Sequence, residues 1–227
     1  MTGAAIRVVM VDDQQIVSDS IAAFLNTVPD IEVVGNALDV ESGISLIFES
    51  NPDVVLLDVE MPGRGSFDIA KEIYRHSPIT KIVYFTEVVS DIFVYQAVNQ
   101  AKARGYLMKN GNGSGNNRPL QTLVDCIRRV STGEYYFCAE VKRRLRFDSG
   151  KNEYSFESKN RLADLSDRQL SVMRLLAKGL SVKEVARTLK VSDKSVDSHK
   201  YRLMRKLGIN DRVQLARYAI REGLVLP

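Results

Sequence analysis

The chain has little cysteine, few prolines and no long hydrophobic run. Its 227 residues include two cysteines, Cys126 and Cys138, which lack the paired spacing of a metal site. We therefore expect two reduced, buried thiols, as is usual in cytosolic proteins. No segment approaches the ~20 apolar residues of a membrane span, and the N-terminus lacks a basic-then-apolar signal pattern. These absences predict a cytoplasmic protein that has no membrane partner.

The prolines of the first half lie between regular segments, where proline is tolerated. Apolar runs that end in turn residues predict five strands, near residues 6–11, 31–37, 54–58, 81–86 and 105–109. Helical segments are expected to alternate with them, near residues 15–27, 41–50, 66–76, 90–102 and 118–132. This alternation predicts an α/β fold built on a doubly wound, five-stranded parallel sheet.

Acidic residues follow two of these strands. Asp12 and Asp13 end the first strand, and Asp58 ends the third. Because ligand sites of open parallel sheets lie beyond the carboxyl ends of the strands, we expect the three carboxylates in one pocket. Clustered carboxylates repel one another unless a cation neutralises them, and oxygen ligands suit Mg²⁺. A carboxylate beside such a metal can attack phosphorus, whereas the alternative is three ordinary solvated loop acids.

Polar residues also follow two further strands. Thr86 comes after the apolar run 82–85, and Lys109 comes after the run 105–108. A hydroxyl and an ammonium group supply a hydrogen bond and a counter-charge to a phosphoryl group. The joint pattern therefore favours a phosphoryl-binding pocket over solvated loop acids.

These strand ends, together with the segment from Leu57 to Gly63, resemble the response-regulator receiver domain over roughly residues 5–133. The resemblance implies a flavodoxin-like sheet with the strand order 2-1-3-4-5. It implies that Asp58 accepts a phosphoryl group from a sensor histidine kinase. It also implies a Mg²⁺ site in which Asp13 and Asp58 are direct ligands, Asp12 acts through water and Glu60 uses its backbone carbonyl.

The same resemblance assigns roles to three residues on the neighbouring strands. Thr86 and Lys109 are expected to bind the phosphoryl oxygens. Tyr106 matches the aromatic switch position that turns inward together with Thr86. The alternative for Tyr106 is a strand aromatic that only packs beneath a helix.

Two features depart from the receiver pattern. Glu87 stands where the family usually has a small residue, and an anion at the rim of the pocket would repel the incoming phosphoryl group. After Lys109 come Asn110 and the glycine-rich stretch 111–117, which lacks the lysine-serine ending of a P-loop. We expect this stretch to be a flexible, slightly lengthened loop. Both departures leave open a receiver that is not regulated by phosphorylation.

Charge is distributed unevenly along the chain. Residues 1–110 contain 8 Lys and Arg against 15 Asp and Glu, whereas residues 164–227 contain 14 against 7. A small basic domain indicates affinity for nucleic acid, although solubility alone can also produce it. We therefore divide the chain into an acidic domain over residues 1–133, a linker over 134–163 and a basic domain over 164–227.

The linker is expected to contain one more helix, from Glu140 to Phe147. Its basic run, residues 142–146, is interpreted as a solvated helix face. Residues 148–161 are polar and almost without aliphatic side chains, so we expect them to form a tether.

The last 64 residues predict a small all-α helix-turn-helix domain. Ser166 is a candidate N-cap of a first helix, and Gly179 is its expected end. A short apolar stripe follows, and Ser192 begins a longer helix that extends from about Asp193 to Leu207. One side of that longer helix is apolar, and the opposite side carries Lys, Ser, Tyr and Arg. Such a helix suits the major groove of DNA, and the alternative is an amphipathic helix with a solvated face.

Residues 165–168, 175–186, 191–199 and 205–208 resemble the LuxR-type helix-turn-helix of NarL/FixJ response regulators. Gln169 and Ser171 depart from it, because the family commonly has glutamates there, and a structural salt bridge is expected to be missing. His199 is expected to be structural. Residues 212–222 resemble the dimerisation helix of the family, which implies a homodimer. The residues expected to contact double-stranded DNA are Lys183, Lys194, Ser195, Asp197, Ser198, Lys200, Tyr201, Arg202, Arg205 and Lys206.

The sequence therefore predicts a DNA-binding transcriptional regulator, and not an enzyme, whose activity is controlled by phosphorylation of Asp58. Two alternatives remain. An aspartyl-phosphate hydrolase usually has a second aspartate two residues after the nucleophile, where this chain has Glu60. A phosphorylation-independent regulator would use its receiver-like domain only for dimerisation or partner binding, and Glu87 is the main support for that alternative.

Overall fold

The apolar runs of the first half form a parallel sheet in the order β2-β1-β3-β4-β5-β6. The computed structural model describes residues 4–61, 66–111, 119–157 and 161–225. The five predicted strands are all present, and β1 and β3 to β5 are buried over almost their whole length. Their bounds are β1 (Ile6–Val11), β2 (Ile31–Ala37), β3 (Val54–Leu57), β4 (Lys81–Thr86) and β5 (Gly105–Met108). The expected doubly wound fold and strand order are therefore confirmed.

Helices cover both faces of this sheet. Helix α1 (Gln15–Leu25) packs against α5 (Pro119–Ser131), and α2 (Val40–Ser50) packs against α3 (Ser66–His76). The expected helix over 90–102 is α4 (Asp91–Tyr95), which continues into the π-helical segment η1 (Gln96–Gln100). Such segments are rare and frequently occur at functional sites. Pro62 and Gly63 lie outside the described residues, as does the glycine-rich stretch 111–117 apart from Gly111.

The linker contains more structure than the sequence predicts. Strand β6 (Tyr136–Phe137) adds a sixth parallel strand. The helix expected over residues 140–147 is limited to the four-residue α6 (Ala139–Lys142), so the interpretation of residues 142–146 as a helix face is wrong after Lys142. Strands β7 (Arg146–Asp148) and β8 (Glu153–Ser155) then form an antiparallel hairpin, so the prediction of a tether is wrong for residues 148–157.

Aromatic packing explains why this polar segment folds. The Tyr154 ring lies 5.1 Å from that of Tyr135, 5.3 Å from Phe137 and 4.9 Å from Phe147, measured between centroids. The Asn99 side chain also exchanges two hydrogen bonds, of 2.9 and 3.0 Å, with the backbone of Phe156. The hairpin is thereby attached to η1, and aromatic contacts replace the aliphatic core that the segment lacks.

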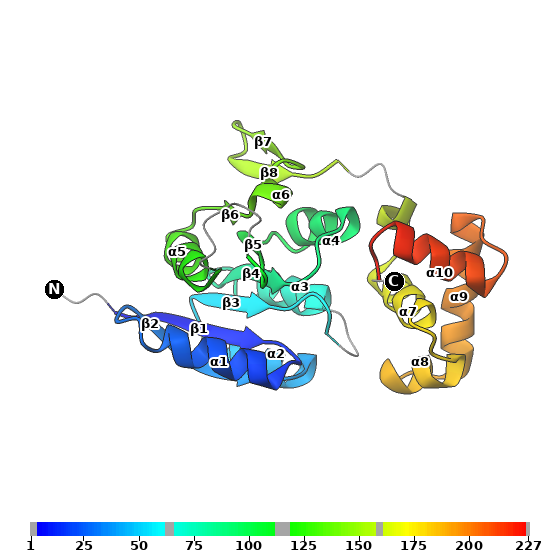
Figure 1. The fold of residues 1–227 in the computed structure, drawn as a ribbon, viewed down its shortest axis with the longest axis horizontal. Coiled ribbons are helices and arrows are strands. Elements are labelled where there is room, and N and C mark those ends of the chain that lie inside the picture. The colour runs from blue at the N-terminus through cyan, green and yellow to red at the C-terminus, as the bar shows by residue number, and fades with distance from the viewer. Residues whose placement is uncertain (1–3, 62–65, 112–118, 158–160, 226–227) are drawn as a thin grey trace.

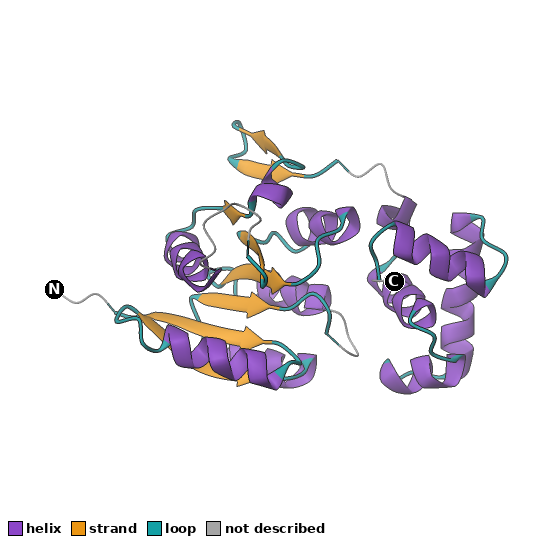
Figure 2. Cartoon of the chain, in the orientation of Figure 1, coloured by secondary structure: helices purple, strands orange, loops and turns teal. Residues whose placement is uncertain are grey.

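The C-terminal part is entirely helical among the residues described (Figure 2). It contains the 3₁₀ turn η2 (Arg161–Asp164), α7 (Asp167–Ala177), α8 (Val182–Thr188), α9 (Asp193–Leu207) and α10 (Arg212–Arg221). Ser166, Ser181, Ser192 and Asp211 cap the four α-helices, each accepting a backbone N–H with its side chain. Gly179 has φ +100°, which lets the chain turn between α7 and α8. The expected helix-turn-helix is confirmed.

The helical domain contacts the sheet domain through α7, and α9 lies on the side away from the receiver-like half (Figure 1). Gln169 stabilises the start of α7, because its side chain accepts a 3.0 Å hydrogen bond from the Ser166 backbone and completes a capping box. Within the described residues, no helix has the length and apolar character needed to cross a bilayer.

Candidate functional site

Three carboxylates meet at the carboxyl ends of β1 and β3. One oxygen from each of Asp12, Asp13 and Asp58 lies within 4.8 Å of the others. The strands fix this arrangement, because the backbone N–H of Asp58 donates to the Val11 carbonyl at 3.0 Å. Asp12 and Asp58 are buried, whereas Asp13 is exposed at the rim. The structure therefore brings together the three acids that the sequence placed in one pocket.

Lys109 and Thr86 reach the same pocket from β5 and β4. The Lys109 Nζ lies 2.7 Å from a carboxylate oxygen of Asp12 and 3.7 Å from one of Asp58. The Thr86 side chain hydrogen-bonds to Asp58, and its hydroxyl oxygen accepts from the Val88 backbone N–H at 3.4 Å. A single ammonium group thus balances part of the charge of two buried carboxylates.

The charge of this pocket is incompletely compensated. Burial raises the pKa of Asp58 from 3.8 to about 6, although the Lys109 ammonium opposes that shift. Burial and the neighbouring Asp12 also raise the pKa of Asp13. Raised pKa values mean that a further positive charge would stabilise the ionised pocket. Since all the donors are carboxylate oxygens, the pocket fits Mg²⁺ by its chemistry.

Tyr106 and Glu87 take different positions near the pocket. Tyr106 is completely buried, and its hydroxyl donates a 2.7 Å hydrogen bond to the Val88 carbonyl. The ring therefore points inward, which fits both the switch position and the alternative of a strand aromatic that only packs beneath a helix. The side chain of Glu87 is exposed to solvent. Glu60 pairs with Lys178 of α7 at 3.1 Å, a contact between the two domains.

A second candidate site lies on α9. Val196, Leu203 and Leu207 bury one side of this helix against the rest of the domain. The opposite side is open, and Tyr201 is 65% exposed with the Arg205 guanidinium 5.8 Å from its ring. The predicted DNA-contacting residues that are exposed are Lys183, Lys194, Asp197, Ser198, Tyr201, Arg202, Arg205 and Lys206, and Ser195 and Lys200 are half-buried.

Some of these side chains have partners within the protein. Lys200 pairs with Asp197 at 2.6 Å, and the Lys206 ammonium donates to the Asp164 carbonyl at 2.8 Å. The half-buried His199 has its pKa lowered by burial, in keeping with a structural role. The remaining Lys and Arg side chains present a basic surface of the kind that phosphate groups bind.

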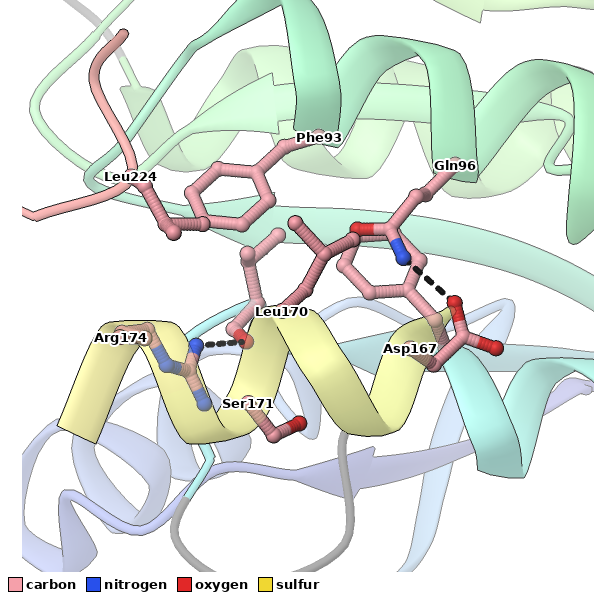
Figure 3. Close-up of a pocket in the computed structure, with 9 residues that line it drawn as sticks. Phe93, Gln96, Asp167, Leu170, Ser171, Arg174 and Leu224 are labelled. Atoms are coloured by element: carbon pink, nitrogen blue, oxygen red, sulfur yellow. Dashed lines mark hydrogen bonds between the residues drawn. The ribbon is translucent and has the colours of Figure 1, made fainter. Parts of the chain in front are cut away.

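A contact between the two domains was not predicted from the sequence. Arg174 of α7 donates to the backbone carbonyls of Val59 and Met61, at 3.4 and 3.1 Å, directly after Asp58. It lines a pocket between the domains together with Leu170, Phe93 and Leu224 (Figure 3). The signal was a second stripe on α7, in which Asp167, Leu170, Ser171, Arg174 and Lys178 share a side of the helix.

Two family models match the chain. Residues 8–114 match the response regulator receiver domain, and residues 163–219 match the bacterial regulatory proteins of the luxR family. The transcriptional regulatory protein LiaR of Bacillus subtilis (strain 168) is 36% identical over 224 residues, which cover 97% of this chain and 99% of LiaR. The response regulator UvrY of Escherichia coli (strain K12) is 33% identical over 219 residues, which cover 96% of this chain and 95% of UvrY.

A solved two-domain structure is similar to most of the chain. RcsB from Salmonella enterica serovar Typhimurium, bound to promoter P1flhDC in the presence of the phosphomimetic BeF3⁻, has a TM-score of 0.62 and 26% identity. The match covers 94% of this chain and 97% of that chain.

Proposed function

The chain is a response regulator of the NarL/FixJ type, with a receiver domain and a LuxR-type DNA-binding domain, and we propose that phosphorylation of Asp58 controls its binding to DNA. The observation that carries this proposal is the pocket itself. A buried carboxylate is hydrogen-bonded to a threonine, lies 3.7 Å from a lysine and is flanked by two further acids. Every one of these groups has a use in phosphoryl transfer.

In the proposed reaction, an oxygen of the ionised Asp58 attacks the phosphorus of a phosphohistidine on a sensor kinase. The O–P bond forms as the N–P bond breaks, and the leaving imidazole keeps the electron pair and takes up a proton. Lys109 and the Thr86 hydroxyl stabilise the charge on the phosphoryl oxygens. Mg²⁺, held by Asp13, Asp58 and the Glu60 carbonyl with Asp12 acting through water, would neutralise charge on the same oxygens.

The response to phosphorylation is proposed to pass through Thr86 and Tyr106. Thr86 would move toward the phosphoryl group, and the Val88 carbonyl that binds the Tyr106 hydroxyl lies two residues away along the chain. That rearrangement reaches α4 and η1, which contact the DNA-binding domain through the Gln96 amide and Asp167 at 2.6 Å. A change at Asp58 therefore has a short structural path to α7.

The DNA-binding step is proposed to use α9 in the major groove of a two-fold site. Lys194 and Arg205 are on the exposed side of α9, whereas Val213 and Ile220 leave apolar surface exposed on α10. Pairing of two chains through α10 would place two α9 helices on successive major grooves. Since α9 is already exposed, release of a covered recognition helix is not needed, and the proposal favours regulation through pairing.

Phosphoryl labelling tests the acceptor directly. The wild-type chain and the Asp58→Ala variant are incubated with labelled acetyl phosphate and Mg²⁺, and we expect label on wild type only. Asp53→Ala is the matched control, since Asp53 precedes the same strand at its other end, and it should label like wild type. Equal labelling of wild type and Asp58→Ala would contradict the proposal.

A further inference from the structure

The second stripe of α7 attaches the DNA-binding domain to the residues that surround the acidic pocket. Arg174 binds the two carbonyls that flank Glu60, and Lys178 pairs with the Glu60 side chain at 3.1 Å. At the start of the helix, Asp167 binds Lys71 of α3 and the Gln96 amide of η1. One helix thus contacts the receiver both beside Asp58 and at the π-helical segment.

Arg174 is the unusual member of this interface. Its side chain is buried, with 8% of the residue exposed, yet among the described residues its hydrogen bonds go to the neutral carbonyl oxygens of Val59 and Met61. A buried guanidinium is costly unless negative charge lies nearby. The charges that favour its ionised form are those of Glu60, Asp58 and Asp13. Burial lowers the pKa of Arg174, and Glu60 together with two carboxylates of the acidic pocket, Asp58 and Asp13, opposes that shift.

A divalent cation in that pocket would change this balance. It would place two positive charges near a buried guanidinium and withdraw the negative charge that offsets its burial. It would also use the carbonyl of Glu60, whose two neighbouring carbonyls Arg174 already holds. Metal binding and docking of the DNA-binding domain would then oppose each other, and the coupling would act equally in both directions.

We propose that Arg174 makes the docked DNA-binding domain a competitor of Mg²⁺ at the phosphoacceptor pocket, so that the closed chain is a poor substrate for phosphorylation. The inference rests on the proposed function for the identity of the cation. In this closed form, with α7 docked on the receiver, α9 lies on the side away from the receiver (Figure 1). Docking therefore limits the chemistry at Asp58 and does not cover α9. Binding of Mg²⁺ favours the open form, in which α7 has left the pocket.

The first test is a Mg²⁺ titration of the full chain without any phosphoryl donor, followed by amide NMR shifts. Arg174→Met keeps much of the side-chain volume and removes the charge, and we expect its Mg²⁺ dissociation constant to fall by about fivefold or more. Arg174→Lys keeps the charge and should show a smaller change. Lys178 is exposed, so Lys178→Gln should fold normally. This variant should also have a lower Mg²⁺ dissociation constant than wild type.

The matched control is Arg212→Met. Arg212 also binds two carbonyl oxygens, those of Leu176 and Leu180, but both belong to its own domain. Its loss should leave the Mg²⁺ dissociation constant unchanged. A constant that is the same in Arg174→Met and wild type would overturn the proposal, as would a chain that binds no Mg²⁺.

The second test reads the domain arrangement by small-angle X-ray scattering. We expect Arg174→Met to have a larger radius of gyration than wild type without metal, and saturating Mg²⁺ to expand wild type. Unchanged scattering of wild type on addition of Mg²⁺ would also overturn the proposal. Neither readout requires a phosphoryl group, so labelling of Asp58 reports separately on the proposed function.

Discussion

Asp58 is an ionisable side chain in a position that disfavours its charge. The residue is 3% exposed and shares its pocket with two other carboxylates, and among the described residues Lys109 is the one ammonium group that pairs with it. Burial, opposed by Lys109, raises the pKa of Asp58 to about 6. The folded state therefore binds a proton more tightly than the unfolded state, and ionisation of Asp58 costs stability until a cation enters the pocket.

Replacement of Asp58 by asparagine should stabilise the metal-free protein. At about pH 7.5 in a chelator we expect the free energy of unfolding to rise by about 1–3 kcal/mol, because the cost of the buried charge is removed. The gain should shrink as the pH falls from about 6 toward 4, where the native carboxyl is already protonated. Urea denaturation at several pH values measures this, and a loss of stability at pH 7.5 would contradict it.

Two buried tyrosines allow a matched comparison of hydroxyl groups. The Tyr106 hydroxyl donates to the Val88 carbonyl at 2.7 Å, whereas the buried Tyr84 hydroxyl has no hydrogen-bond partner among the described residues. Tyr106→Phe should cost about 1 kcal/mol of unfolding free energy, and Tyr84→Phe should be neutral or stabilising by a similar amount. Thermal denaturation distinguishes them, and equal losses in both variants would be the contrary result.

At the scale of elements, η1 is the receiver segment that contacts both the DNA-binding domain and the β7-β8 hairpin. Gln96 binds Asp167 of α7, and Asn99 holds the β7-β8 hairpin through the backbone of Phe156. The backbone N–H of Ala101 donates to the Gln96 carbonyl at 2.9 Å, the wide hydrogen bond of a π-helix. Because π-helical segments often occur at functional sites, we propose that η1 transmits the movement of Thr86 on β4 and Tyr106 on β5 to α7.

Asn99→Ala should detach the hairpin without unfolding the sheet. Both side-chain hydrogen bonds to Phe156 are lost, so we expect limited proteolysis within residues 146–157 to become several-fold faster. The melting temperature of the rest of the chain should change little. Cleavage at the wild-type rate would show that the aromatic contacts of Tyr154 alone hold the hairpin.

The exposed side of α9 should control the salt dependence of DNA binding. Lys194→Ala and Arg205→Ala each remove one charge from the proposed interface and should reduce the slope of log affinity against log salt by about 1. Lys151→Ala removes a charge from the turn of the hairpin and should leave the slope unchanged. Filter binding at a series of salt concentrations gives the slopes, and equal slopes in all variants would exclude α9 as the contact surface.

Much of the fold was predictable from patterns of apolar and polar residues that extend over only a few positions in the sequence. Apolar runs and the polar residues after them located five strands and the pocket of Asp58, because the ends of parallel strands meet at one edge. Strand β6 was missed, since Tyr136 and Phe137 are too few to show a pattern. The hairpin was missed because its stability comes from Tyr154 and three other aromatic rings rather than from an aliphatic run.

The interdomain contact was not predictable for a different reason. Arg174 and Val59 are separated by 115 positions in the sequence, and an arginine on a helix is usually solvated. Only the docking of two separately folded units gives this side chain its partners. The candidate site residues of each domain were predicted within that domain, from strand-end and helix patterns and from the resemblance to its family, whereas the coupling between the domains depends on their arrangement.

At the scale of the whole molecule, the two functional surfaces lie on opposite sides of the interface. Residues of α7 bind the segment that follows Asp58, and α9 is on the far side of the helical domain (Figure 1). The proposed regulation by phosphorylation would therefore act through the arrangement of the domains or the pairing of chains, and not through a lid over α9. The acidic receiver and the basic tail also favour domain contacts that weaken with salt.

DNA affinity with and without beryllofluoride is the measurement that tests the central claim most directly. The full chain is titrated onto a fragment recovered by mapping of bound genomic sites, in the presence of Mg²⁺ at fixed salt. We expect beryllofluoride to tighten binding of the wild type about tenfold and to leave Asp58→Ala unchanged. Equal affinity of the wild type in both conditions would contradict the account and leave a DNA-binding protein without a phosphorylation switch.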